Sequence, residues 1–249
     1  VRSAISSSAT DRTKNFQDTM RQVQSAIKTR TKLLATIATL LLLAAVWSRT
    51  KAASIDAMID RISATWVIDR DRIFVTGFSN GASMTFRLGA ELSHRVAAIA
   101  PVAGTCWIKK PKPANALSLC YITGAADSLN PIEGGYPKLA FGGKEQGGQP
   151  KPAVQTFIDE WAAALHCPQE PRGDETSNGI HKRLYGPGRH KAEVMVITVE
   201  GLGHHWPGGI SQAPQFLLGK PSKKLSATDV IWEFFRSHPG VRVSAVPAG

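Results

Sequence analysis

Apolar and polar residues follow two different spacings along the chain, and these spacings predict helices and strands in alternation. Apolar residues recur every three to four positions over residues 54–66, which is the pattern of an amphipathic helix. A short run rich in β-branched and aromatic residues follows at residues 72–76 and stops at Gly77, as expected of a buried strand. Helical spacing resumes over residues 82–92. The pattern therefore predicts a helix, a strand, a sharp turn and a second helix.

The same alternation continues through the rest of the chain. The pattern predicts strands at residues 96–104, 116–124 and 192–200, and helices at residues 152–166 and 226–238. Ser226 and Asp229 have the spacing of a capping box at the start of the last helix. Strands that alternate with helices are typical of α/β proteins, in which helices cover both faces of a mainly parallel sheet. We therefore expect an α/β fold built around one such sheet.

The N-terminal segment departs from this alternation. Residues 20–32 carry four basic residues, and a mainly apolar run follows at residues 33–47. This arrangement is typical of a secretory signal, whereas a spanning helix needs about 20 apolar residues. We therefore predict a leader over residues 1–52, a folded domain over residues 53–249, and a secreted protein, extracellular or periplasmic. A buried core helix and an uncleaved anchor are the alternatives, and a stable membrane partner is expected only if the leader is retained.

Charge and cysteine content narrow the classes of function. The net charge of +11 is concentrated in the leader, so the rest of the chain is only mildly basic. It has no basic stripe with interleaved aromatic residues, no metal-ligand spacing and no glycine-rich phosphate loop, so we expect no nucleic-acid partner, no metal and no cofactor. Three cysteines remain open between one disulfide with a leftover thiol and three buried thiols, namely Cys106, Cys120 and Cys167.

The residues Gly77 to Gly81, GFSNG, match the GxSxG pattern of a nucleophile elbow. This elbow places a serine on a tight turn between a strand and a helix, which is the context predicted for Ser79. The same turn would place the backbone N–H of Asn80 at a helix N-terminus, where it can donate to an oxyanion. The alternative is an ordinary turn between a strand and a helix.

A serine nucleophile needs a histidine base and a carboxylate that orients it. In α/β-hydrolases these residues follow the serine in the order acid, then base, at the carboxyl ends of later strands. Asp127 lies just past the strand predicted at residues 116–124, and Glu133 is a competitor six residues further along. The adjacent histidines His204 and His205 follow the last predicted strand. Spacing alone does not decide between these two histidines.

Four stretches resemble the esterase PHB depolymerase family, which comprises secreted polyhydroxybutyrate depolymerases and feruloyl esterases of the α/β-hydrolase fold. In chain order, the stretches are TGFSNGASM, ITGAADSLNPIEGG, GLGHHWPGG and SATDVIWEFF. The family pattern has its catalytic histidine directly after GxG, which implies His204 as the base and leaves His205 beside it. It also implies Ser79 as the nucleophile and Asp127 as the acid. Trp206, Gly134 and Gly135 are then expected to bind substrate as a wall and loop of the cleft.

The resemblance implies a three-layer α/β-hydrolase fold and a secreted serine esterase. Its expected partner is a polymeric or small ester substrate, either a polyester such as polyhydroxybutyrate or a polysaccharide that carries acyl or feruloyl groups. Members often have a cysteine near the position of His190 that pairs with the equivalent of Cys167, so this chain departs from that disulfide.

A second departure lies upstream of the elbow. Members have two or more strands and an HG-containing loop before the nucleophile, but no His-Gly dipeptide precedes Ser79. We therefore expect an N-terminally truncated domain in which the nucleophile strand forms an exposed edge of the sheet. The alternative function is a truncated, catalytically impaired or inactive hydrolase remnant. In a third interpretation, residues 33–47 are retained beside the nucleophile strand.

Overall fold

The computed structural model describes residues 52–138, 149–210 and 215–240. Contacts divide the chain into the units Val1–Met58 and Ile59–Gly249, and only residues 52–58 of the first unit are described. The apolar run predicted as part of a leader lies outside the described residues.

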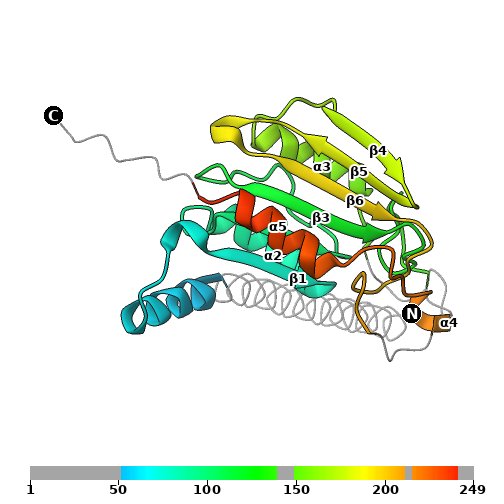
Figure 1. Cartoon of the computed structure of the whole chain (residues 1–249), viewed down its shortest axis with the longest axis horizontal. Helices are drawn as coiled ribbons and strands as arrows, with labels where there is room; N and C mark the ends of the chain where they lie inside the picture. The colour runs from blue at the N-terminus through cyan, green and yellow to red at the C-terminus, as the bar shows by residue number, and fades with distance from the viewer. Residues whose placement is uncertain (1–51, 139–148, 211–214, 241–249) are drawn as a thin grey trace, which may run out of the picture. The chain divides into compact units, whose positions relative to one another are not determined.

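A six-stranded sheet forms the centre of this unit (Figure 1). Four strands run parallel: β1 (Phe74–Phe78), β2 (Ala98–Val102), β3 (Ser118–Gly124) and β6 (Val194–Val199). The antiparallel strands β5 (Ile180–Tyr185) and β4 (Gly173–Ser177) extend it, giving the order β1-β2-β3-β6-β5-β4. The mainly parallel α/β fold is confirmed. Within the described residues β1 is an edge strand, as expected for the strand before the elbow.

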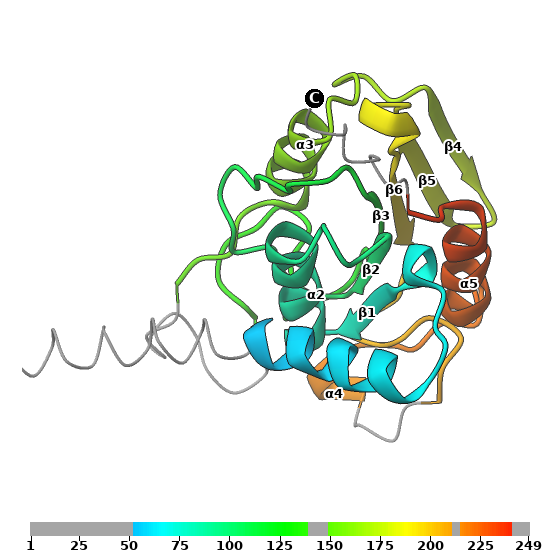
Figure 2. The ribbon, with the colours of Figure 1, turned by 90° about the vertical axis from the view of Figure 1, so that its left-hand side faces the viewer.

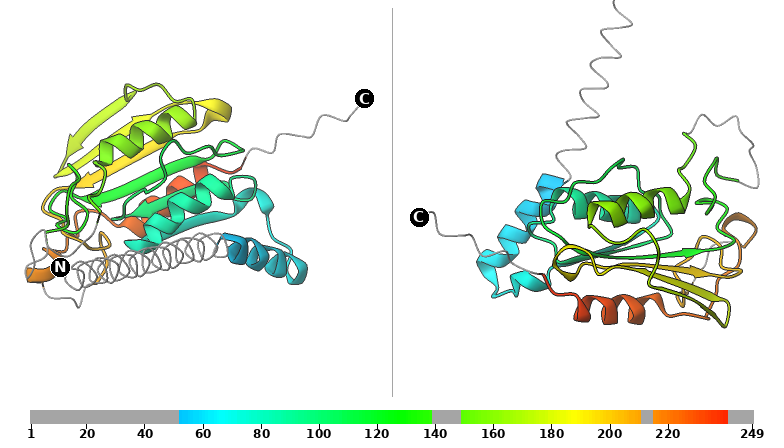
Figure 3. Two further views of the ribbon diagram at one scale, coloured as in Figure 1. Left: turned by 180° about the vertical axis from the view of Figure 1, so that it is seen from behind. Right: turned by 90° about the horizontal axis from the view of Figure 1, so that it is seen from above.

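Helices cover both faces of the sheet, which gives three layers (Figures 2 and 3). The helices α2 (Asn80–Glu91) and α3 (Val154–Ala164) lie on one face, and α5 (Ala227–Ser237) lies on the other. β2 and β3 are buried along their whole lengths because they are covered on both sides. The cap predicted for α5 is present, since the Ser226 hydroxyl accepts a hydrogen bond from the Asp229 N–H.

The sequence analysis missed the hairpin of β4 and β5. β4 is polar and mostly exposed, and β5 is mostly half-buried with polar residues at its centre, so both strands lack the apolar runs that marked the other strands. The turn signal was nevertheless present: Asn178 and Gly179 connect the strands and both have positive φ, as an Asn-Gly hairpin turn requires. The short helix α4 (Gln215–Leu218) and the 3-10 turns Arg70–Arg72 and Arg189–Lys191 were also not predicted as such.

The predicted N-terminal helix is present over residues 52–65, but its apolar face is not uniformly covered. Ile59 is buried, whereas the side chains of Met58 and Ile62 are 49% and 43% exposed. The apolar face of this helix is therefore only partly buried. None of the helices in the described ranges is long and apolar enough to span a bilayer.

The structure decides between the two alternatives left open for the cysteines. Cys106, Cys120 and Cys167 are all buried free thiols. Burial favours the neutral form of a thiol, and it raises the pKa of Cys120 to about 12 and that of Cys167 to about 11. These side chains are therefore protonated core residues at neutral pH.

Candidate active site

Ser79 occupies the turn between β1 and α2 in a strained backbone conformation. Its φ of 56° and ψ of −116° lie in a region that residues with a side chain rarely adopt. Ser79 is the N-cap of α2, but its hydroxyl makes no capping hydrogen bond. A serine at this position normally uses its hydroxyl to cap the helix. Here the hydroxyl is free to interact with another side chain.

The loop after β2 packs closely against this turn. A Cβ on Gly104 would lie 2.5 Å from the Cβ of Ala82 and would overlap the carbonyl oxygen of Ser79. The Ser79 N–H donates to the carbonyl of Val102, and the Tyr121 hydroxyl donates to that of Gly104, each at 2.9 Å. Only a glycine fits at position 104, and this loop packs directly against the strained turn and supports it. The sequence analysis had interpreted this glycine only as the end of a strand.

His204 connects Ser79 to Asp127. The Nε2 atom of His204 lies 2.9 Å from Ser79 Oγ, and its Nδ1 atom lies 2.8 Å from Asp127 Oδ2. The backbone N–H of His204 donates to the carbonyl of Leu218 at the end of α4, and the ring lies 4.9 Å from that of Phe78. Both the backbone and the ring of His204 are therefore held by neighbouring segments.

Asp127 is 3% exposed, and both of its carboxylate oxygens are hydrogen-bonded. Oδ1 accepts from the backbone N–H groups of Leu129 and Asn130 at 2.9 and 2.8 Å, while Oδ2 faces His204. Oδ1 is therefore satisfied by backbone donors, and Oδ2 is left to accept from His204. The competitor Glu133 is exposed and is not joined to His204.

This arrangement determines how His204 can exchange protons. An ionised Asp127 can only accept, so it holds the imidazole proton on Nδ1 and leaves the lone pair of Nε2 directed at Ser79 Oγ. The hydroxyl proton of Ser79 then has an acceptor within hydrogen-bonding distance. As the first residue of α2, Asn80 has no helical carbonyl for its own N–H, so that donor is available at the same turn.

The remaining predicted site residues lie nearby but make structural contacts. His205 is buried, and its Nε2 atom lies 3.0 Å from the carbonyl of Gly219. Trp206 packs against the apolar core, and its indole N–H donates to Thr228 on α5 at 3.2 Å. Gly134 and Gly135 contact the backbone of the segment before α3. Substrate contacts for Trp206 and the two glycines stay a prediction.

Sequence reasoning missed a polar cluster behind His204 and Asp127. Its members are Thr105, Asn130 and Lys151, and both the Thr105 hydroxyl and the Lys151 ammonium donate to Oδ1 of Asn130. Burial lowers the pKa of Lys151, and the nearby charge of Asp127 opposes that shift. Asn130 lies in the stretch around Asp127 but was given no role there, and only the fold brings it together with Thr105 from the loop after β2 and Lys151 from the segment before α3.

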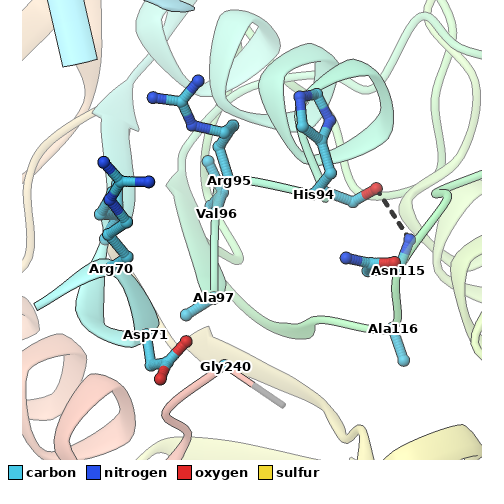
Figure 4. Close-up of a pocket in the computed structure, with 11 residues that line it drawn as sticks. Arg70, Asp71, His94, Arg95, Val96, Ala97, Asn115, Ala116 and Gly240 are labelled. Atoms are coloured by element: carbon cyan, nitrogen blue, oxygen red, sulfur yellow. Dashed lines mark hydrogen bonds between the residues drawn. The ribbon is translucent and has the colours of Figure 1, made fainter. Parts of the chain in front are cut away.

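A separate cavity in the described part of the chain lies elsewhere. It has a volume of about 220 Å³ and is lined at the amino ends of the strands by residues that include Arg70, Asp71, His94 and Arg95 (Figure 4). Parallel strands place their carboxyl ends, and hence Ser79, at the opposite edge of the sheet. In the same described residues no group of three His, Cys, Asp or Glu side chains could hold a metal ion.

Fold and site together define an α/β-hydrolase with a serine, histidine and aspartate aligned at the carboxyl ends of a parallel sheet. The family described as Phospholipase/Carboxylesterase matches residues 4–136, which is more than half of the chain. The chain therefore belongs to the phospholipase/carboxylesterase family. The matched range includes Ser79 and Asp127, and it begins within the segment predicted as a leader.

Individual relatives support the resemblance drawn from the four motifs. The chain is 29% identical over 196 residues to NocK of Nocardia uniformis subsp. tsuyamanensis, whose name describes it as an esterase, covering 72% of this chain and 55% of the relative. It is 25% identical to poly(3-hydroxyalkanoate) depolymerase C of Paucimonas lemoignei and 26% identical to feruloyl esterase B of Piromyces equi. These matches cover 63% and 59% of this chain and 41% and 27% of the relatives. The chain thus spans about half the length of the curated relatives it matches, or less.

Among solved structures, the chain is similar to an acetyl xylan esterase from Aspergillus awamori. The two are 16% identical, with a TM-score of 0.45 and a match that covers 61% of each chain.

Proposed function

We propose that this protein is a serine ester hydrolase that acts through an acyl-enzyme intermediate. The observation that carries the proposal is the continuous contact from Ser79 Oγ to His204 Nε2 at 2.9 Å and from His204 Nδ1 to Asp127 Oδ2 at 2.8 Å. Membership of a carboxylesterase family supports the same class of reaction. Cys106, Cys120 and Cys167 do not compete as nucleophiles, because burial raises the pKa of all three thiols and keeps them protonated.

In the proposed reaction, Ser79 Oγ attacks the ester carbonyl while His204 Nε2 accepts the hydroxyl proton. Asp127 stabilises the imidazolium that forms, and the N–H of Asn80 donates to the oxyanion of the tetrahedral intermediate. The intermediate collapses as His204 returns the proton to the leaving alcohol. A water molecule, deprotonated by the same nitrogen, then releases the acid from Ser79.

The proposed substrates are polyesters such as polyhydroxybutyrate, or acyl and feruloyl esters on polysaccharides. Support comes from the names of two relatives, a polyhydroxyalkanoate depolymerase and a feruloyl esterase. We also propose export, which is supported only by the basic segment and the apolar run before residue 48. Detection of the protein in the medium, with a new N-terminus after the apolar run, would test that part.

The reaction can be tested with purified full-length protein and a short p-nitrophenyl ester. We expect turnover that disappears in Ser79→Ala and persists in Ser83→Ala, a matched variant of the next serine along α2 whose hydroxyl bonds the Thr105 carbonyl. Covalent labelling of wild-type protein by a fluorophosphonate, mapped to Ser79 by mass spectrometry, is the second readout. Equal turnover by wild type and Ser79→Ala would rule out the mechanism.

A further inference from the structure

The side-chain amide of Asn130 joins several loops directly behind the triad. Its Nδ2 atom donates to the carbonyl of Ala103 at 2.9 Å and lies 3.2 Å from His204 Nδ1. Its Oδ1 atom accepts from Thr105 Oγ1 at 3.0 Å and from the ammonium of Lys151. Asn130 is buried, so this amide is fully committed to protein partners.

The partners of Oδ1 fix which way the amide faces. The ammonium of Lys151 can only donate, so a rotation of the amide by half a turn would set its NH₂ group against that cation. The NH₂ group therefore faces the Ala103 carbonyl and His204. The Nδ1–H group of His204 donates a hydrogen bond to Asp127. The second N–H of Asn130 contacts the imidazole beside it and takes no part in proton transfer. The contact limits how far the ring can move.

Backbone contacts with Gly134 and Gly135, in the loop that follows Asp127, hold Lys151 in place. Gly135 and Lys151 exchange two backbone hydrogen bonds, of 2.9 and 2.8 Å. A Cβ on Gly134 would lie 2.6 Å from the carbonyl oxygen of Lys151, so only a glycine allows this approach. The two glycines expected to line a substrate cleft thus position the lysine that orients Asn130.

Asn130 also acts on Asp127 through its main chain. Its backbone N–H donates to Asp127 Oδ1 at 2.8 Å. One residue therefore contacts the acid with its backbone and the base with its side chain, and its side chain also bonds Thr105 in the loop after β2.

We propose that Asn130, oriented by Lys151, is a positioning residue that holds the imidazole of His204 in register with Asp127 and Ser79. The kinetic part of this inference rests on the proposed esterase function. The geometric part, the alignment of His204 with Asp127, does not, and the two can be tested separately.

The kinetic test compares Asn130→Leu, which keeps the size of the side chain and removes its polar atoms, with wild-type protein. We expect kcat to fall on the order of tens of fold, with KM changed less than about twofold, because a small displacement of a catalytic group slows the chemical step rather than binding. Asn115→Leu is the matched control, since Asn115 lines the cavity at the amino ends of the strands. Its kcat should stay at the wild-type value.

Lysine variants test the outer contact by itself. Lys151→Met should lower kcat by less than Asn130→Leu, and Lys151→Arg should restore most of the loss because it keeps a cationic donor. Lys109→Met removes a charge from the same surface cavity that Lys151 lines and should have no effect. These variants keep the inference testable if Asn130→Leu does not fold.

The geometric test is the NMR signal of the proton shared between His204 Nδ1 and Asp127, which a strong hydrogen bond moves far downfield. We expect this signal in wild type and in Ser79→Ala, and we expect it to shift or broaden in Asn130→Leu. An unchanged signal together with an unchanged kcat in folded Asn130→Leu would overturn the inference. A wild-type protein without esterase activity would overturn the proposed function, and the signal alone would then decide the role of Asn130.

Discussion

Both ends of the parallel strands gather charged side chains and histidines, but within the described residues only those at the carboxyl ends are buried. Ser79, Asp127 and His204 lie at the carboxyl ends, where Asp127 and His204 are buried and hydrogen-bonded. At the amino ends, His94 is exposed and Arg95 pairs with the largely exposed Asp60 around the cavity of Figure 4. Water screens charges at the exposed end, whereas fixed partners replace water at the buried end. The cavity of Figure 4 is therefore not the expected place of the chemistry of this protein.

The largest expected contrast is between two histidines, one at each end. His204→Ala should lower kcat by about 10⁵- to 10⁶-fold, because it removes the proposed general base. His94→Ala changes the same residue type at the amino-end cavity of Figure 4 and should leave turnover at the wild-type level. Initial rates on a p-nitrophenyl ester measure both. Loss of activity in His94→Ala, with folding intact, would move the functional site to the amino ends.

A second contrast uses one glycine from each end. Gly104→Ala adds a Cβ that overlaps Ser79, so we expect a free energy of unfolding lower by about 1–3 kcal/mol. Turnover should fall on the order of 100-fold, because the nucleophile is displaced. In Gly240→Ala the nearest atom would be 3.3 Å away, and only a small change in stability is expected. Urea denaturation and steady-state rates would show whether the carboxyl end is the less tolerant of the two.

Alkaline pH should lower the free energy of unfolding through Cys120, which lies in β3 between the two ends of the sheet. Burial raises the pKa of the Cys120 thiol from 9.0 to about 12, so the unfolded thiol loses its proton at a lower pH than the folded one. The contribution of this thiol to the free energy of unfolding should therefore be constant below pH 9. Above pH 9 it should fall by about 1.4 kcal/mol per pH unit.

Denaturant midpoints measured from pH 7 to pH 10.5 would test this expectation. Cys120→Ala should be less stable than wild type at pH 7 but should show a shallower loss above pH 9. Parallel curves for the two proteins would contradict the assignment of this effect to Cys120.

The smallest effect is expected at the amino-end ion pair. Arg95 contacts Asp60 at 2.5 Å, with side chains 23% and 67% exposed. Exposed pairs of this kind contribute about 1 kcal/mol or less, so Arg95→Ala should lower stability by no more than that and leave turnover unchanged. A loss above this range, seen by thermal or urea unfolding, would show that the amino end is more constrained than its exposure indicates.

The sequence predicted those elements whose burial imposes an apolar pattern. β2, β3 and β6 are each covered on both faces, and each lies within two residues of its predicted bounds. The hairpin of β4 and β5 was missed because strands that are exposed or only half-buried need no apolar run. The apolar spacing before residue 66 indicated a helix correctly, but periodicity shows which face is apolar and not whether anything covers it.

The sequence by itself determined the alternation of strands and helices, the elbow around Ser79, and the order in which an acid and a base follow it, because these depend on local spacing and on the direction of parallel strands. Only the tertiary structure decided the remaining questions. It gave His204 and His205 different partners, where spacing alone left them equivalent and only the family pattern pointed to His204, and it brought Asn130 and Lys151 together behind the triad. Contacts between distant loops depend on how the chain packs, which leaves no periodic trace in the sequence.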